Sequence, residues 1–328
     1  MSGADALVDA LVDVLVIGDA NPDLLLTGDT RPRFGQAEQL LDSADMLLGG
    51  SAAIVACGLA RLGVRTALAA VVGADRFGEF MLDTLRSRGV DVSAIEVSPD
   101  RPTGLSVVLS EPGDRAILTL PGTIPALTAD AALDAVDRLR PRHVHIASYF
   151  LQPGLAAALP GLLDGLRERG VTVSIDTNWD PAERWTGLHE VLPRVDVFLP
   201  NEEEALAVAT ALDDSGTAPE GLDAAASAIS RLGCRVVVKA GAEGGRAYER
   251  GSLVAHAPGL TVDVVDTTGA GDSFDAGYLA ALVGGIADEE ERLRWAAAAG
   301  SLSVRGLGGI GAQATGAELT DAVAGALR

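Results

Sequence analysis

The sequence predicts an α/β fold in which helices cover both faces of a central, mostly parallel β-sheet. Along the second half of the chain, short apolar runs alternate with longer segments that have helical spacing. Polar residues follow several of these runs, at the sheet edge where open α/β folds bind ligands. Hydrophobic residues make up 48% of the 328 residues and aromatic residues only 4%, so Ala, Val and Leu must build the core.

The first half of the chain adds strands of a second kind to this pattern. Strands are expected at 13–19, 24–26, 39–48, 66–72, 105–110 and 115–120. Helices are expected at 52–62 and 78–88, each followed by a glycine that would end it. Glu-Pro-Gly-Asp at 111–114 indicates a hairpin turn. We expect the antiparallel strands within about 22–48 and 104–120 to form a small accessory sheet.

The second half alternates regularly between strands and helices. Strands are expected at 143–147, 171–175, 195–199 and 235–239. Helices are expected at 130–139, 153–169, 202–211, 222–232, 270–282, 288–301 and 316–327. No repeat, low-complexity tail or linker interrupts the pattern, so we expect a single domain over 1–328.

Charge and composition exclude several classes of function. The net charge of −21 argues against a surface for nucleic acid or anionic membranes, and it repels phosphates at long range. No apolar run reaches the length of about 20 residues that crosses a bilayer. Residues 1–10 carry no basic residue and do not resemble a secretory signal. Cys57 and Cys234 are isolated, as in reduced proteins, and we therefore expect a cytoplasmic protein.

The most informative segment is 266–277, Asp-Thr-Thr-Gly-Ala-Gly-Asp-Ser-Phe-Asp-Ala-Gly. A β-rich run at 260–265 precedes it, and helical spacing follows. Three small residues therefore stand where a loop becomes the first turn of a helix, whose free N–H groups suit a phosphate. The carboxylate of Asp272 comes next, which favours phosphoryl transfer to a hydroxyl. Taken alone, the pattern also fits a glycine-rich loop followed by an acidic residue at a helix start.

Three features together resemble the ribokinase-like, or PfkB, family of carbohydrate kinases, and the resemblance covers essentially the whole chain. The family's C-terminal signature is matched throughout 266–279. A Gly-Gly pair opens the helix at Gly49-Gly50-Ser51-Ala52-Ala53, and an Asn-x-x-Glu pattern follows a central strand at Asn201 and Glu204. The resemblance implies a ribokinase-like fold, with a central, mostly parallel sheet flanked by helices on both faces and a small accessory β-sheet as a lid.

The resemblance also implies roles for individual residues. Asp272 would act as catalytic base, and the backbone at Gly269, Ala270 and Gly271 would stabilise the transferred phosphoryl group. ATP and Mg²⁺ would be the cofactors, with a monovalent cation such as K⁺ as a further candidate near 306–311. Mg²⁺ would be organised by Asn201 and Glu204, which also fit a helix cap. The nucleotide would lie along Asn201, Lys239, Gly241, Gly244 and Thr268. Lys239 is the one lysine of the sequence. It fits equally well the role of a strand-end residue that contacts no ligand.

For the acceptor, the resemblance implies contacts from Asn21, Asp23, Gly49, Gly50, Ser51, Tyr149 and Asn178. Many relatives carry Asn at the position of Ile54, which cannot bond a hydroxyl, so a ribose or fructose acceptor does not follow. Arg115, on an expected lid strand, is either a contact for an anionic acceptor or a solubilising residue.

We therefore expect a kinase that phosphorylates a primary alcohol of a sugar or sugar acid. A nucleoside kinase on the same scaffold is the alternative. An NAD-dependent oxidoreductase would need GxGxxG after the first strand, where Gly18-Asp19-Ala20-Asn21-Pro22-Asp23 stands instead. An inactive sugar-binding regulator is a further alternative, against which the retained Asp272 argues. Exposed lid strands predict a homodimer that pairs through the lid.

Overall fold

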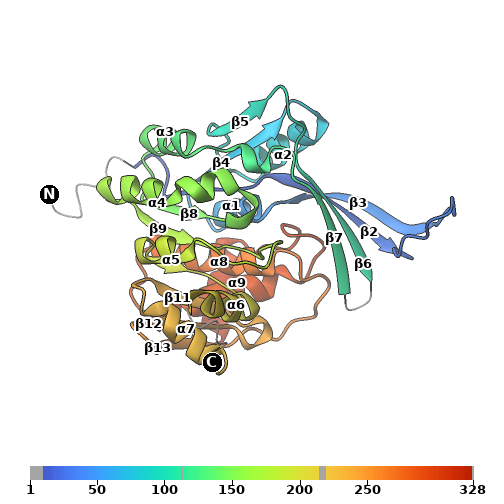
Figure 1. The fold of residues 1–328 in the computed structure, drawn as a ribbon. Helices are drawn as coiled ribbons and strands as arrows, with labels where there is room; N and C mark the ends of the chain where they lie inside the picture. Colours follow the sequence, from blue (N-terminus) through green and yellow to red (C-terminus); the bar gives the residue numbers. More distant parts are fainter. Residues whose placement is uncertain (1–9, 112–113, 214–218, 327–328) are drawn as a thin grey trace.

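Two β-sheets organise the protein, seen in a computed structural model that describes residues 10–111, 114–213 and 219–326. Expectations for residues 1–9, for the turn positions 112–113 and for the helix end at 327 lie outside the described residues. Within that part, a nine-stranded sheet forms the body, and a four-stranded sheet projects from one side of it (Figure 1).

The body sheet has the order β13-β12-β11-β10-β9-β8-β1-β4-β5 among the described strands. Its strands are β1 (Val14–Ile17), β4 (Thr66–Gly73), β5 (Ile95–Ser98), β8 (His143–Ile146), β9 (Thr172–Ile175), β10 (Val197–Phe198), β11 (Arg235–Lys239), β12 (Gly245–Glu249) and β13 (Ser252–Ala257). All neighbours pair in parallel except β11 with β12 and β12 with β13. The prediction of a mostly parallel sheet is confirmed.

Helices cover both faces of this sheet, because alternate residues of each buried strand point to opposite sides. Leu15 and Ile17 of β1 pack with α3 (Ala129–Leu139), α4 (Pro153–Glu168), α5 (Leu188–Val191), α6 (Glu202–Leu212) and α7 (Leu222–Ser230). Val14 and Val16 pack with α1 (Ser51–Arg61), α2 (Arg76–Ser87), α8 (Ala270–Val283) and α9 (Glu289–Ser303). The last helix, α10 (Gly316–Ala326), packs against α9. No helix of the described residues is long and apolar enough to cross a membrane.

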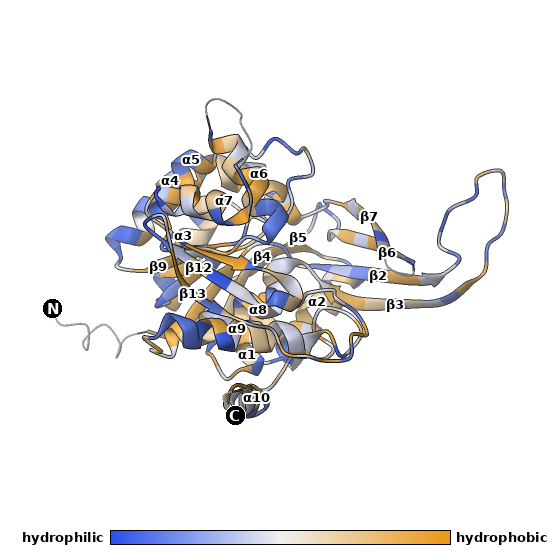
Figure 2. Ribbon diagram, turned by 90° about the horizontal axis from the view of Figure 1, so that it is seen from below, coloured by the Kyte–Doolittle hydropathy of each residue, from blue (hydrophilic) through white to orange (hydrophobic). Residues whose placement is uncertain are grey.

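The projecting sheet, which we call the lid, has the order β3-β2-β6-β7. It contains β2 (Asn21–Gly28), β3 (Leu41–Gly49), β6 (Leu105–Glu111) and β7 (Asp114–Leu120). Its hairpin partners are antiparallel, but β2 pairs with β6 in parallel, so the accessory sheet contains one parallel pair. Seen from below, these strands extend well away from the helices of the body (Figure 2).

One expected strand is wrong. The run 260–265 joins neither sheet; instead the backbone amide of Leu260 bonds Ser301 and that of Val265 bonds the carbonyl of Val304. The antiparallel strands β12 and β13, which the sequence interpretation missed, occupy that edge of the sheet. Leu260, Thr261, Val262 and Val264 instead form part of the wall of a cavity beside α9.

Close packing of α8 on α9 depends on Gly277, where an added Cβ would lie 2.7 Å from the Cβ of Ala299. By contrast, a Cβ at Gly161 of α4 would meet nothing within 4 Å.

We predict that Gly277→Ala lowers the free energy of unfolding by about 1–3 kcal/mol, because the new methyl group must push α9 away. Gly161→Ala is the matched control, since it makes the same change inside a helix with open space. That variant should gain up to about 1 kcal/mol from helix propensity. Urea denaturation measures both, and equal effects in the two variants would contradict the packing argument.

Candidate active site

The first turn of α8 lies at the centre of the polar cluster that the sequence places beyond the strands. Its N-cap residue, Gly269, has a left-handed backbone (φ +70°), and an added Cβ would lie 2.6 Å from the Cα of Gly309. The amide of Ala270 already donates to the carbonyl of Thr267 at 3.2 Å. Among the described residues, the amides of Gly271 and Asp272 donate no hydrogen bond, so these two remain for an anion.

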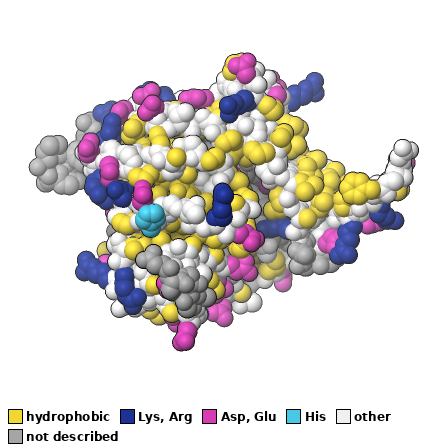
Figure 3. Space-filling view, viewed as in Figure 1, with side chains coloured by type: hydrophobic (Ala, Val, Ile, Leu, Met, Phe, Trp, Pro, Cys, Tyr) yellow, Lys and Arg dark blue, Asp and Glu magenta, His cyan; other side chains and the backbone are white. Residues whose placement is uncertain are grey.

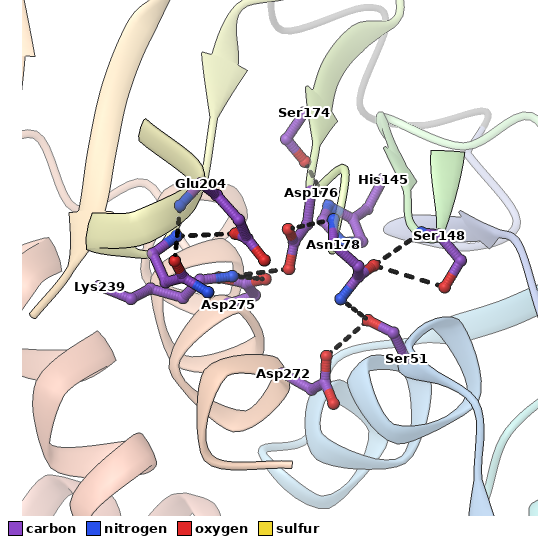
Figure 4. A network of polar contacts seen from close by, with 11 residues as sticks. Ser51, His145, Ser148, Ser174, Asp176, Asn178, Glu204, Lys239, Asp272 and Asp275 are labelled. Atoms are coloured by element: carbon purple, nitrogen blue, oxygen red, sulfur yellow. Dashed lines mark hydrogen bonds and ion pairs between the residues drawn. The ribbon is translucent and has the colours of Figure 1, made fainter. Parts of the chain in front are cut away.

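Asp272 of this turn faces the first turn of α1. Its Oδ1 accepts a hydrogen bond from Oγ of Ser51 at 2.5 Å, and Ser51 in turn accepts from Nδ2 of Asn178 at 3.2 Å (Figure 4). Burial raises the pKa of Asp272 to about 7, although the Ser51 hydrogen bond lowers it. A carboxylate with this pKa can accept a proton near neutral pH.

The start of α1 is held by Asp19, which the sequence interpretation did not assign to the site. Its carboxylate accepts from the amides of Ser51 at 3.2 Å and Ala52 at 3.0 Å. Burial raises the pKa of Asp19. The signal was available, because Asp19 directly follows the first strand, but nothing in the sequence showed that it faces a helix start more than 30 residues later.

Two cavities open on either side of the α8 start. The lid cavity, of about 260 Å³, lies under the lid sheet. Its walls include Asp19, Asn21, Asp23, Gly50, Ser51, Ile54, Ser106, Arg115, Thr268, Gly269 and Asp272. The loop cavity, of about 490 Å³, lies between the end of β11 and α9. Its walls include Lys239, Gly241, Gly244, Val264, Thr267, Ala270, Gly271, Phe274 and Ser301.

The lid cavity combines polar groups at one end with apolar walls. Nδ2 of Asn21 lies 3.3 Å from both Oδ1 of Asp23 and Oγ of Ser106. Burial raises the pKa of Asp23 to about 7. From β7, Arg115 reaches the loop before α8 and donates to Oγ1 of Thr268 at 3.2 Å. A ligand here would meet both carboxylates and a guanidinium.

Beneath the α8 start, Lys239 forms ion pairs with two buried aspartates (Figure 4). Its Nζ lies 2.6 Å from Oδ2 of Asp176 and 3.3 Å from Oδ2 of Asp275. Burial opposes ionisation of Asp176, but Lys239 lowers its pKa overall, whereas burial raises the pKa of Asp275. The sequence interpretation missed Asp275, for which the available signal was an acidic residue inside an apolar helix, since buried charges are normally paired.

The expected helix cap at α6 is present. The amide of Glu204 donates to Oδ1 of Asn201 and the amide of Asn201 donates to Oε2 of Glu204, both at 2.9 Å. Burial raises the pKa of Glu204 to about 7. Among the described residues no group of three or more His, Cys, Asp or Glu side chains is arranged to hold a metal ion.

The structure brings most of the expected site residues to this edge of the sheet. Thr268 borders the lid cavity, although it was expected on the nucleotide side. Asn178 reaches the site through the hydrogen bond that it donates to Ser51. Tyr149 is buried against Phe150 and is absent from the walls of both cavities, so a contact with the acceptor stays a prediction. Gly49 borders neither cavity; it leaves room for the carboxylate of Asp23, from which an added Cβ would lie only 2.2 Å away.

Comparison with known proteins agrees with this geometry. The sequence matches the pfkB family of carbohydrate kinases over residues 12–315. It is 34% identical, over 89% of this chain and 92% of the relative, to the ATP-dependent ribose-1-phosphate kinase of Halopiger xanaduensis. Among solved structures, a putative ribokinase II from E. coli in complex with ATP and Mg²⁺ has a TM-score of 0.81 and 25% identity, covering 95% of this chain and 99% of that one. Arabidopsis thaliana ribokinase complexed with ribose and ATP has a TM-score of 0.81 and 26% identity, covering 95% and 98%.

The chain belongs to the pfkB family of carbohydrate kinases and is therefore a sugar kinase, a phosphotransferase with an alcohol acceptor. Its ribokinase-like fold is confirmed. Membership of this family excludes the oxidoreductase alternative.

We predict that Asp272→Asn stabilises the protein at high pH. The folded-state pKa of about 7 lies above the unfolded value of about 3.9, so the native state binds more protons between these values and stability falls as pH rises through this window. Removing the charge should raise the free energy of unfolding on the order of 2 kcal/mol at pH 8 and change it little at pH 4. Urea titrations at both pH values test this, and an equal effect at both would contradict it.

Proposed function

We propose that this carbohydrate kinase transfers the γ-phosphoryl group of ATP to a primary alcohol of a sugar or sugar acid in the lid cavity, with Asp272 as the base. One observation carries the proposal: the first turn of α8 borders both cavities, with Asp272 facing the lid cavity and Gly271 facing the loop cavity. Two substrates that approach from opposite sides would meet at this turn.

In this mechanism Asp272 takes the proton from the acceptor hydroxyl as the hydroxyl oxygen attacks the γ-phosphorus. The transition state of phosphoryl transfer is loose, so positioning and charge stabilisation contribute most of the catalysis. The amides of Gly271 and Asp272 stabilise the charge on the transferred group, together with the backbone at Gly269 and Ala270 that shapes the turn. The product is a phosphate ester, and ADP leaves from the other side.

The nucleotide would bind in the loop cavity, beside Gly241 and Gly244 and the apolar wall of 260–265. Lys239 borders this cavity but is already paired with Asp176 and Asp275, and its charge keeps Asp176 ionised. If Lys239 also contacted a phosphate, its positive charge would be divided between that phosphate and the two aspartates.

Mg²⁺ would be held by Glu204 and Asn201, which are absent from the walls of both cavities; Asn201 pairs with Lys239, a wall residue of the loop cavity. Glu204 is a buried carboxylate whose raised pKa indicates an unfavourable charge, which a cation would relieve. Mg²⁺ keeps several waters and needs few protein ligands, so Glu204 and Asn201 with the phosphates of ATP are a sufficient set. The ion would neutralise charge on the phosphates. K⁺ is the candidate monovalent cation near 306–311.

The lid cavity favours an acceptor that is less hydroxylated than ribose or carries a negative charge. Ile54 gives an apolar wall where many relatives carry a hydroxyl-binding Asn, and Arg115 presents a guanidinium from β7. A carboxylate or phosphate on the acceptor would pair with this guanidinium. A nucleoside kinase remains the alternative, since an adenosine-type acceptor also fits a cavity with apolar walls.

ADP release in the presence of Mg-ATP should be measured with ribose, ribose 1-phosphate, fructose, 2-keto-3-deoxygluconate and adenosine. We expect activity on a sugar or sugar acid, and Asp272→Asn should reduce kcat by about 10²–10⁴-fold, because the general base is lost. Activity on adenosine alone would contradict the proposal. A sugar that raises the melting temperature without any ADP release would favour an inactive sugar-binding protein.

We also propose that two copies pair through the outer face of the lid. The strand registers place Leu24, Met46, Val107 and Leu118 on one face, opposite the face that borders the lid cavity. Leu118 is 60% exposed and Met46 43%. Hydrophobic side chains gather on the projecting part of the molecule (Figure 3). Such a patch on strands is normally covered by another surface.

Light scattering at micromolar concentration should give the mass of a dimer, and Leu118→Lys should give a monomer, because two charges would be buried in the contact. Leu253→Lys is the matched control, since Leu253 is 51% exposed on β13 of the body sheet, and it should leave the dimer intact. A wild-type monomer would overturn the proposal.

A further inference from the structure

A line of hydrogen bonds leads from the backbone of the body sheet to Asp272. The amide of Ser148 donates to Oδ1 of Asn178 at 2.8 Å, and Nδ2 of Asn178 donates to Oγ of Ser51 at 3.2 Å. Oγ of Ser51 lies 2.5 Å from Oδ1 of Asp272. We call these four residues the relay; Figure 4 shows them in sequence between the end of β8 and the start of α8.

The direction of every bond in the relay is fixed by its first member. A backbone amide can only donate, so the side-chain oxygen of Asn178 must face Ser148 and its NH₂ group must face Ser51. Ser51 therefore accepts one bond, and its single hydroxyl proton is left to donate to Asp272. Hydrogen bonds in such chains polarise one another and strengthen the last member.

The protein holds the relay in a backbone geometry that is costly to maintain. Ser148 and Asn178 both have left-handed backbones, with φ of +56° and +53°, although neither is glycine. Ser51 is fixed from its other side, because the carboxylate of Asp19 accepts from its amide. Strained residues of this kind persist where the surrounding structure determines their position, and they concentrate at functional sites.

We propose that Ser51 is a positioning residue for the base Asp272, and that Asn178 fixes the direction in which the Ser51 hydroxyl donates. This inference rests on the proposed function of Asp272. It gives Ser51 and Asn178 a task other than the sugar contacts expected from the sequence. The bond from Ser51 holds Oδ1, which leaves Oδ2 of the carboxylate for the acceptor hydroxyl.

The relay should also favour the ionised form of Asp272. Other charged groups face this carboxylate as well: Asp176 and Asp19 raise its pKa, Lys239 lowers it, and Asp23 and Arg115 line the same cavity. These charged groups all remain when the Ser51 hydroxyl is removed. A change in the titration of Asp272 therefore reports the loss of the hydrogen bond from Ser51.

The direct test is the titration of the Asp272 carboxyl carbon by NMR in protein labelled with ¹³C-aspartate, without any substrate. Asp272→Asn identifies the signal. Ser51→Ala should shift the titration upward by about one pH unit, since a hydrogen bond to the charged form is lost. Ser51→Thr keeps the hydroxyl and should restore the wild-type value. Asn178→Ala should shift the Asp272 titration upward by a smaller amount. This variant takes the place of Ser51→Ala in the test if Ser51→Ala does not fold.

Kinetics on the acceptor found by the substrate panel separate positioning from binding. Ser51→Ala should lower kcat about tenfold at pH 7 and move the acid limb of kcat/KM upward, with little change in KM for the acceptor. The double variant Ser51→Ala, Asn178→Ala should be no worse than Ser51→Ala, because both break one chain. Thr128→Ala is the control: it removes a hydroxyl from the N-cap of α3, at a residue that borders neither cavity, and should leave the pH profile unchanged.

A Ser51→Ala protein in which Asp272 titrates as in the wild type would overturn the relay, as would a raised KM with an unmoved acid limb or additive effects of the two substitutions. The NMR titration needs no acceptor. If the shift occurs but no acceptor is phosphorylated, the proposed function fails and the relay stands.

Discussion

The polar site depends on the ion pairs that Lys239 makes with Asp176 and Asp275. These aspartates, together with Asp272 and Glu204, gather acidic groups around the chain's one lysine at the sheet edge. Lys239 stabilises the charge of Asp176, whereas burial raises the pKa values of Asp272 and Glu204 to about 7. A buried cation that keeps Asp176 ionised thus leaves the other carboxylates poised to take a proton or a metal ion, which is the chemistry that a phosphoryl transfer site requires.

The position of the α8 start follows from packing more than from charge. Gly269 lies against Gly309 and Gly277 lies against α9, so the helix sits where a larger side chain at either place would displace it. This placement puts one helical turn between the lid cavity and the loop cavity. Under the proposed function, its backbone amides would face a phosphate while Asp272 would face the acceptor.

The two faces of the lid have different chemistry because residues alternate along its strands. One face carries Asn21, Asp23, Ser106 and Arg115 toward the cavity, and the other carries apolar side chains outward. If a second copy covers the outer face, assembly would stabilise the strands that form the cavity wall. Substrate binding and association would then be coupled through one thin sheet.

The sequence by itself determined the strand–helix alternation and the motif at α8, because these depend on periodicity and on contiguous residues; that Asp272 is the base is a prediction from the family resemblance. The sequence also predicted the cap formed by Asn201 and Glu204, which lie within one helical turn. Only the tertiary structure decided the conformation of 260–265. This run lines a cavity, and the antiparallel strands β12 and β13 take the edge of the sheet instead. The tertiary structure alone decided the partners of Lys239, the role of Asp19 at α1 and the line from Ser148 to Asp272. Each of these joins segments that are far apart in the chain, and their distances are set by packing, which no local pattern records.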